Sequence, residues 1–167
     1  MAHTVIDDVV LDYGGTLTQP DAPVVPYLGM RPVDPEVIPA LRLLHDQGKR
    51  LLLASNTRPY LSRRLALRQA QIEHLFTALF ESHDLGFAKP EDAFYECVLL
   101  AAKCPPRQVL WVGNNLESDV RGPLRHGMHA VLVAPDATTN DQTLPNGAYS
   151  ISHVRHLPRL LEEICGC

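Results

Sequence analysis

The chain has 167 residues and a formal net charge of −4, and this size predicts a single compact domain over residues 1–167. Because 46% of the residues are hydrophobic and 20% are charged, the composition excludes a disordered chain, and no apolar run of about 18 residues is present to cross a membrane. The acidic balance provides no basic field for a phosphate backbone, so we expect neither nucleic acid nor a membrane as a partner.

The first predicted elements form a strand–helix–strand unit. Residues 5–12 are a β-branched apolar run that ends at a glycine pair, which is typical of a buried strand. Asp34 is a suitable helix N-cap before Pro35, and apolar residues follow at helical spacing until Gly48. Residues 50–55 predict a second buried strand, which ends in a polar cluster.

The rest of the chain alternates between helical patterns and short apolar runs. We expect helices over residues 60–71, 91–103, 119–126 and 157–164. We expect strands over residues 77–81, 108–112, 130–133 and 148–151. Such alternation predicts the α/β class, as a three-layer α/β/α doubly wound parallel sheet with helices on both faces.

Polar residues stand where several of these predicted strands end. Asp12 ends the first strand and Ser55 the second, while Asn114 and then Asp119 follow a later one. Lys89 precedes a proline and a helix that begins with acidic residues. Because ligands bind beyond the carboxyl ends of such strands, we expect these side chains around one crevice. A nucleophilic carboxylate, a hydroxyl, an ammonium and a second carboxylate together suit phosphoryl transfer.

Four motifs in this order give the chain a resemblance to the haloacid dehalogenase-like (HAD) hydrolases. They are LDYGGTLT with Asp12, LLLASNT with Ser55, AKPEDAF with Lys89, and VGNNLESDVRGPLRHGM with Asp119. The resemblance covers the chain from the first strand to about Val133. It implies a Rossmann-like HAD core and a magnesium-dependent phosphatase that works through an aspartyl-phosphate.

The resemblance also implies a role for each matched residue. The implied catalytic residues are Asp12, Ser55, Lys89 and Asp119. Magnesium prefers oxygen ligands and keeps several waters. Its expected ligands are Asp12, the backbone carbonyl of Gly14, the side chain of Asn114 and a water held by Asp119. Contacts with the substrate are expected from Gly15, Thr16, Asn56, Arg58 and Asn115.

Two residues depart from the family pattern. Gly14 stands where the family usually has a second aspartate, which protonates the leaving group and then activates water, and such acid–base help is typically worth about 10²–10⁴-fold. Asn114 stands where an acid normally binds the metal, which predicts weaker magnesium binding. We therefore expect a slow or specialised phosphatase. Two alternatives stay open: a magnesium-independent hydrolase resembling true haloacid dehalogenases, and a non-catalytic binding or regulatory protein on the same fold.

Neither interval in which HAD members insert a cap has room for one. Residues 17–34, called the flap below, are proline-rich and irregular, and the second interval is filled by one helix and one strand. The predicted crevice is therefore open. The substrate is expected to be a phosphorylated small molecule or a larger phosphorylated molecule, and a homo-oligomer whose neighbouring subunit serves as a lid is a further alternative. The flap and Arg58 are the expected specificity elements.

The cysteines and the first residues bear on the compartment. The N-terminal apolar stretch is too short and too acidic for the core of a signal peptide. Four cysteines are too few and too unevenly placed for a secreted disulfide scaffold. We therefore expect a cytoplasmic protein, and we assign no role to Cys165 and Cys167.

Overall fold

The computed structural model describes residues 4–135 and 143–166, so Cys167 of the terminal cysteine pair lies outside the described part. Within it, six strands form one parallel sheet in the order β3-β2-β1-β4-β5-β6. The strands are β1 (Asp8–Leu11), β2 (Arg50–Ser55), β3 (Phe76–Glu81), β4 (Val109–Gly113), β5 (His129–Val133) and β6 (Ala148–Ile151). This order confirms the doubly wound parallel sheet.

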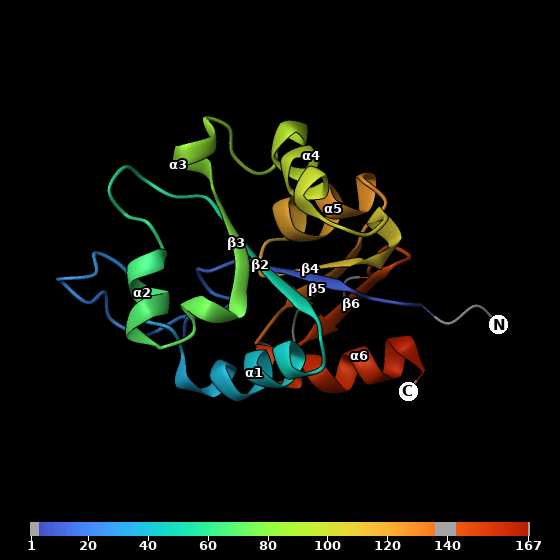
Figure 1. The fold of residues 1–167 in the computed structure, drawn as a ribbon, viewed down its shortest axis with the longest axis horizontal. Coiled ribbons are helices and arrows are strands. Elements are labelled where there is room, and N and C mark those ends of the chain that lie inside the picture. Colours follow the sequence, from blue (N-terminus) through green and yellow to red (C-terminus); the bar gives the residue numbers. More distant parts are fainter. Residues whose placement is uncertain (1–3, 136–142, 167) are drawn as a thin grey trace.

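Helices cover both faces of the sheet (Figure 1). One face carries α1 (Ile38–Asp46) and α6 (Leu157–Cys165), and the opposite face carries α4 (Asp92–Ala101) and α5 (Gly122–Arg125). Two further short helices flank β3, namely α2 (Arg64–Gln69) and α3 (Ser82–Leu85). The three-layer α/β/α architecture is therefore confirmed.

The core explains why the four inner strands, β2, β1, β4 and β5, are apolar on both sides. Successive side chains of a strand point to opposite faces of the sheet. Val9 and Leu11 therefore join a core with Leu44 of α1, whereas Val10 joins a second core with Phe94 of α4. Because both faces are covered, the strands lack the alternation of apolar and polar residues that marks a half-exposed sheet.

The sequence predicts the strands better than the helix starts. The strand over residues 50–55 has the predicted bounds, whereas the helix expected from residue 60 begins at Arg64. Tyr60 has a φ of 63°, which a helix does not allow, and the Ser62 hydroxyl oxygen accepts a hydrogen bond from the Arg64 N–H at 3.2 Å. The segment expected to be one helix over 119–126 consists of a π-helical turn, Leu116–Arg121, followed by α5.

The flap is an ordered part of the fold. Its side chains Leu28, Met30 and Val33 are buried in the core beside α1. Within residues 4–135, the interval between β1 and β2 contains the flap, one 3₁₀ turn and α1. The interval between β2 and β3 contains α2 and a second 3₁₀ turn. The expected absence of a cap domain is confirmed for this part of the chain. None of the described helices has the length and apolar character needed to cross a membrane.

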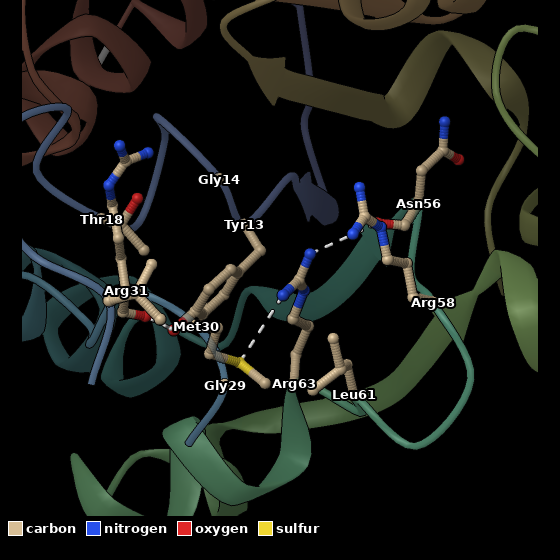
Figure 2. Close-up of a pocket in the computed structure, with 11 residues that line it drawn as sticks. Tyr13, Gly14, Thr18, Gly29, Met30, Arg31, Asn56, Arg58, Leu61 and Arg63 are labelled. Carbon is tan, nitrogen blue, oxygen red and sulfur yellow. Dashed lines mark hydrogen bonds between the residues drawn. The ribbon is translucent and has the colours of Figure 1, made fainter. Parts of the chain in front are cut away.

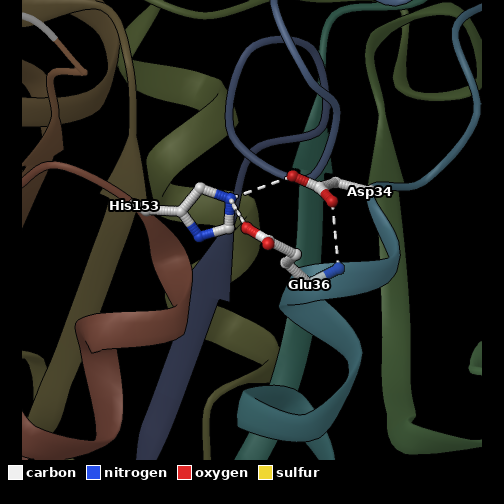
Figure 3. Close-up of side chains that lie close together, drawn as sticks. All are labelled: Asp34, Glu36 and His153. Atoms are coloured by element: carbon white, nitrogen blue, oxygen red, sulfur yellow. Dashed lines mark hydrogen bonds and ion pairs between the residues drawn. The ribbon is translucent and has the colours of Figure 1, made fainter.

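A cluster of three side chains anchors the end of the flap (Figure 3). Nε2 of His153 lies 2.9 Å from Oδ2 of Asp34 and 3.9 Å from Oε2 of Glu36. These groups are close enough to offer ligands to a metal ion. However, Nδ1 of His153 accepts a hydrogen bond from the Arg155 N–H, so in the neutral ring Nε2 carries the proton and donates it to Asp34. We therefore interpret the cluster as a link between the flap and the C-terminal segment.

Replacing Asp34 with alanine is expected to lower the free energy of unfolding by about 1–3 kcal/mol. The Asp34 side chain is buried, caps the helical turn by accepting from the Glu36 N–H at 2.9 Å, and pairs with His153. Urea unfolding of both proteins measures the difference. Asp46→Ala, at an exposed position at the end of α1, is the control and should change stability by less than about 0.5 kcal/mol.

The loss of stability in Asp34→Ala is expected to depend on pH. Burial raises the pKa of Asp34, but the Glu36 N–H and His153 outweigh burial and hold this pKa below its usual value. A carboxyl group with a lowered folded pKa stabilises the protein above its unfolded pKa of about 4, and this contribution is lost as the pH falls further. The difference between wild type and Asp34→Ala should therefore be largest near neutral pH and shrink below about pH 4. A difference that grows in acid would contradict this assignment.

Candidate active site

Three of the predicted residues meet where β1 and β4 end. Asp12 follows β1, and Lys89 lies in the segment before α4. Nζ of Lys89 lies 3.2 Å from Oδ1 of Asp12 and 2.8 Å from Oδ1 of Asp119. From β1 the chain first adds β2 and β3 on one side, and it later adds β4, β5 and β6 on the other side of β1. Doubly wound folds bind ligands at the point where the strand order changes direction in this way, which here lies between β1 and β4. The fold thus brings two acids and a lysine together in the expected crevice.

Burial sets the electrostatics of this cluster. The side chain of Asp119 is fully buried and that of Lys89 is 2% exposed, whereas that of Asp12 is 14% exposed. Burial raises the pKa of Asp12 to about 6 in spite of the neighbouring lysine. Burial would lower the pKa of Lys89, but the two carboxylates outweigh it and raise that pKa, so the ammonium stays charged. Asp12 is therefore the member of the cluster that a ligand can reach.

Asp119 is held as a fixed counter-ion for Lys89. Besides the lysine, its Oδ1 accepts from Nε1 of Trp111 at 3.2 Å, and its Oδ2 accepts from the Asn115 N–H at 3.1 Å. A Cβ at Gly113, the last residue of β4, would lie 2.2 Å from Cγ of Asp119. A residue with a Cβ at position 113 would overlap the Asp119 carboxylate, so the position requires a glycine. Because a carboxylate offers about four acceptor positions and three are used, one acceptor position of Asp119 stays unused.

The loop after β2 positions Lys89 from the other side. The side chain of Asn56 forms two hydrogen bonds with the Lys89 backbone, since Nδ2 donates to the carbonyl and Oδ1 accepts from the N–H, both at 2.9 Å. The Ser55 hydroxyl oxygen, at the end of β2, accepts from Nε of Arg63 at 3.1 Å. Asn56, predicted to contact substrate, thus contacts the backbone of the candidate catalytic lysine.

The glycine-rich loop after Asp12 lies against Asn114. Gly15 has a φ of 71°, and a Cβ there would lie 2.3 Å from the amide nitrogen of Asn114. Gly14 faces open space, because a Cβ added there would meet no heavy atom within 4 Å beyond its two chain neighbours. The carboxylate, carbonyl and amide oxygens of Asp12, Gly14 and Asn114 are hard ligands of the kind that magnesium prefers, and their role as its ligands stays a prediction.

Thr16 and Asn115, which are predicted to contact the substrate, lie in surroundings set by the protein itself. Thr16 is 4% exposed, and its hydroxyl has no hydrogen-bond partner among the described residues. The side-chain oxygen of Asn115 accepts from the N–H groups of Glu117 and Ser118, which caps the π-helical turn. Contacts of Thr16 and Asn115 with a substrate stay predictions.

Comparison with known proteins gives the family. The profile of the haloacid dehalogenase-like hydrolases matches residues 9–127, which include the whole cluster. The chain belongs to this family. Its parallel sheet with helices on both faces is therefore that of a HAD hydrolase core.

Relatives with assigned activities match only in part. A phosphoserine phosphatase from Thermus thermophilus is 32% identical over 102 residues, which are 61% of this chain and 41% of that protein. A glyceraldehyde 3-phosphate phosphatase from Methanothermobacter thermautotrophicus is 34% identical over 67 residues, which are 40% of this chain and 30% of that protein. The chain thus spans less than half the length of these two HAD relatives.

Solved structures match over nearly the whole chain. A 2-haloacid dehalogenase from Pseudomonas syringae has a TM-score of 0.77 at 18% identity, with 95% of this chain and 99% of that one covered. A HAD phosphatase from Thermococcus onnurineus has a TM-score of 0.73 at 19% identity, with 93% and 98% covered. At such low identity these similarities establish the HAD fold.

A cavity of about 420 Å³ adjoins the cluster in this HAD core (Figure 2). We call it the arginine cavity, because its wall includes Arg31 of the flap together with Arg58 and Arg63 of the segment after β2. Tyr13 and Gly14, which directly follow Asp12, form another part of the wall. Figure 2 shows Arg31 at the left of the view, Arg63 near its middle and Arg58 to the right.

Sequence reasoning finds Arg58 but misses Arg63. The Arg63 guanidinium lies 4.8 Å from the centre of the Tyr13 ring and donates to Ser55, and its backbone N–H donates to Oε1 of Glu81 at 3.1 Å. Burial lowers the pKa of Arg63, although nearby acids oppose this effect. The segment from Arg58 to Arg68 contains several arginines, and no local pattern marks the one that reaches Ser55.

Proposed function

We propose that the chain is a phosphohydrolase that cleaves a phosphate ester through an aspartyl-phosphate on Asp12. The observation that carries this proposal is the partly exposed Asp12 carboxylate beside Lys89, whose charge is held in place by the buried Asp119. The relatives named as phosphatases support the same class of reaction. Phosphorylated compounds are accordingly the proposed substrates.

The proposed reaction has two steps. An oxygen of Asp12 attacks phosphorus and the ester P–O bond breaks, so the alcohol leaves as an alkoxide that takes a proton from water. Water then attacks the acyl-phosphate, the bond between phosphorus and the Asp12 oxygen breaks, and inorganic phosphate leaves with Asp12 regenerated. Lys89 stabilises the negative charge of the transferring group, together with the Ser55 hydroxyl and backbone N–H groups of the glycine-rich loop.

Magnesium is the proposed cofactor, with Asp12, the Gly14 carbonyl and Asn114 as oxygen ligands and Asp119 holding a water. When bound, the ion neutralises charge on the transferring phosphoryl group and lets the anionic Asp12 approach it. The cluster itself supports a cation here, because two carboxylates face only one ammonium. The amide of Asn114 in place of a carboxylate predicts moderate affinity.

A panel of aryl, alkyl and acyl phosphates assayed with and without magnesium tests the proposal. We expect release of inorganic phosphate that requires the metal and proceeds fastest with activated esters. Turnover that is independent of metal would favour the dehalogenase-like alternative. If no compound in the panel is turned over, the chain is a non-catalytic member of the family.

Introducing an acid at position 14 is expected to accelerate the hydrolysis of alkyl phosphates. Gly14 lacks a left-handed backbone conformation and has open space around it, so a side chain can be added without strain. Because general acid help matters most for poor leaving groups, Gly14→Asp should raise alkyl phosphate rates by about 10²-fold and aryl phosphate rates much less. The dependence of rate on leaving-group pKa measures this change.

Gly14→Asn is the matched control, because it has the same size without an acid. A similar gain in both variants would show that the added volume, and not the proton, changes the rate. If the wild type hydrolyses alkyl and aryl phosphates equally fast, another residue already supplies the proton and Gly14 is no handicap.

The remaining expectations also belong to this proposal. Among the described residues, the thiols of Cys97, Cys104 and Cys165 form no disulfide, and the cytoplasmic location stays a proposal. The open crevice agrees with a lid provided by a neighbouring subunit, and this oligomeric arrangement stays a prediction.

A further inference from the structure

We propose that the substrate carries a second anionic group, a carboxylate or a second phosphate, which binds in the arginine cavity while the scissile phosphoryl group lies at Asp12. This proposal rests on the proposed function and names its substrate class. The arginine cavity has the volume of a small-molecule site, which favours a small substrate over a macromolecule.

Most of the positive charge that lines the arginine cavity has no acidic partner among the described residues, since only Arg63 lies near acids, namely Asp12 and Glu81. Three arginines line it, and none of the described lining residues is an acid. Neither Arg31 nor Arg58 forms an ion pair within residues 4–135 and 143–166. Nε of Arg31 donates to the Ala22 carbonyl at 2.8 Å, which fixes the side chain and leaves its terminal nitrogens available. Like charges around one cavity repel each other, so an anionic ligand gains favourable interactions with both free guanidinium groups.

Arg63 differs from the other two arginines because its hydrogen bonds are used inside the protein. Nε bonds the Ser55 hydroxyl, and a terminal nitrogen donates to the Asn56 carbonyl at 3.3 Å. Arg63 thereby joins the arginine cavity to the end of β2, beside the phosphoryl site. The two anionic groups of the substrate would lie on the two sides of this residue.

The rest of the cavity wall fits a short carbon chain between two anions. Leu61, Met30 and Val24 supply apolar contacts, and Gly29 brings the backbone of the flap close. A planar guanidinium binds a carboxylate or phosphate through two parallel hydrogen bonds, which a neutral hydroxyl cannot reproduce. The cavity should therefore distinguish substrates by charge more than by shape.

The experiment compares four phosphate esters of similar size on the magnesium-loaded full chain. Glycerol 3-phosphate has no second anion, 3-phosphoglycerate has a carboxylate, propanediol bisphosphate has a second phosphate, and phosphoethanolamine has an ammonium. We expect kcat/KM for the two esters with a second anion to exceed that for glycerol 3-phosphate by about 10- to 100-fold. Phosphoethanolamine should be the poorest substrate. The carboxylate and bisphosphate arms show which anion is preferred.

The arginines are then tested through this preference ratio. Arg58→Gln and Arg31→Gln should each reduce it by about 10-fold. Arg107→Gln removes the same charge from an exposed position before the amino end of β4, whereas the arginine cavity lies beyond the carboxyl ends of the strands. This control should leave the ratio unchanged. Equal kcat/KM for all four esters, or a ratio that survives both substitutions, would overturn the substrate class while leaving the proposed phosphohydrolase intact.

A binding measurement keeps the two proposals distinguishable. Calorimetric titration of Asp12→Asn with 3-phosphoglycerate and glycerol 3-phosphate should show about 10-fold tighter binding of the former, lost in the double variant with Arg58→Gln. If no ester is hydrolysed but this difference in affinity is found, the phosphohydrolase proposal fails and the binding of a dianion stands. If the affinities are equal, the second anionic group is excluded.

Discussion

Asp12→Asn is expected to reduce the hydrolysis of phosphate esters by about 10⁴-fold or more while leaving the fold intact. The variant keeps the size of the side chain and removes the nucleophilic oxygen. The side chain is the exposed member of a buried cluster with two acids and one ammonium, so its loss removes excess negative charge. The variant should therefore melt at the wild-type temperature or above it.

Two measurements make this result specific. Asp46→Asn removes a carboxylate from an exposed position at the other edge of the sheet and should keep wild-type kcat. Rapid acid quenching of the wild type with a labelled phosphate ester should trap phosphate on the protein, and the Asp12→Asn protein should trap none. A folded Asp12→Asn enzyme that retains near-wild-type turnover would refute the aspartyl-phosphate.

Lys89→Met is expected to lower the free energy of unfolding by about 3–5 kcal/mol at neutral pH and to abolish turnover. Methionine approximates the length of lysine but leaves the fully buried Asp119 without its counter-charge. Urea unfolding measures the loss. The control Lys103→Met, at an exposed position after α4, should change stability by less than about 0.5 kcal/mol.

The double variant with Lys89→Met and Asp119→Asn separates charge from packing. Because the buried charge is then removed together with its partner, most of the lost stability should return, although turnover should not. If the double variant is as unstable as Lys89→Met, the loss arises from packing around position 89 and not from an unpaired carboxylate.

The sequence predicts the sheet and the reacting cluster because their signals are local. Each strand is a short apolar run that ends in polar residues, and the sheet then places those ends at one edge. Asp12 could be assigned to the crevice in this way, whereas Lys89 ends no strand and is assigned with the help of the family resemblance of its motif. The bounds of β2 are predicted to the residue for the same reason, since both of its ends are marked by polar neighbours.

The rest depends on contacts that no local pattern encodes. Arg63 reaches Ser55 from the position just before α2, a helix that begins four residues later than the sequence predicts. Asn56 lines the arginine cavity, so its predicted contact with a substrate stays a prediction, but its hydrogen bonds to the backbone of Lys89, 33 residues later, could not be foreseen. The position of Arg31 follows from the packing of the flap, which becomes visible only in three dimensions.

The link between Asp34 and His153 joins residues 119 positions apart, and this separation has a consequence for synthesis on the ribosome. Every side chain of the reacting cluster has been added to the chain by residue 119, whereas the anchor of the flap is added more than thirty residues later. Contacts between distant residues form late because closing a long loop costs chain entropy. The nascent chain therefore contains all the groups proposed for phosphoryl transfer before the link between Asp34 and His153 can form. This link, which adds to the packing of the flap on the core, would thus be one of the last contacts of the fold to form during translation.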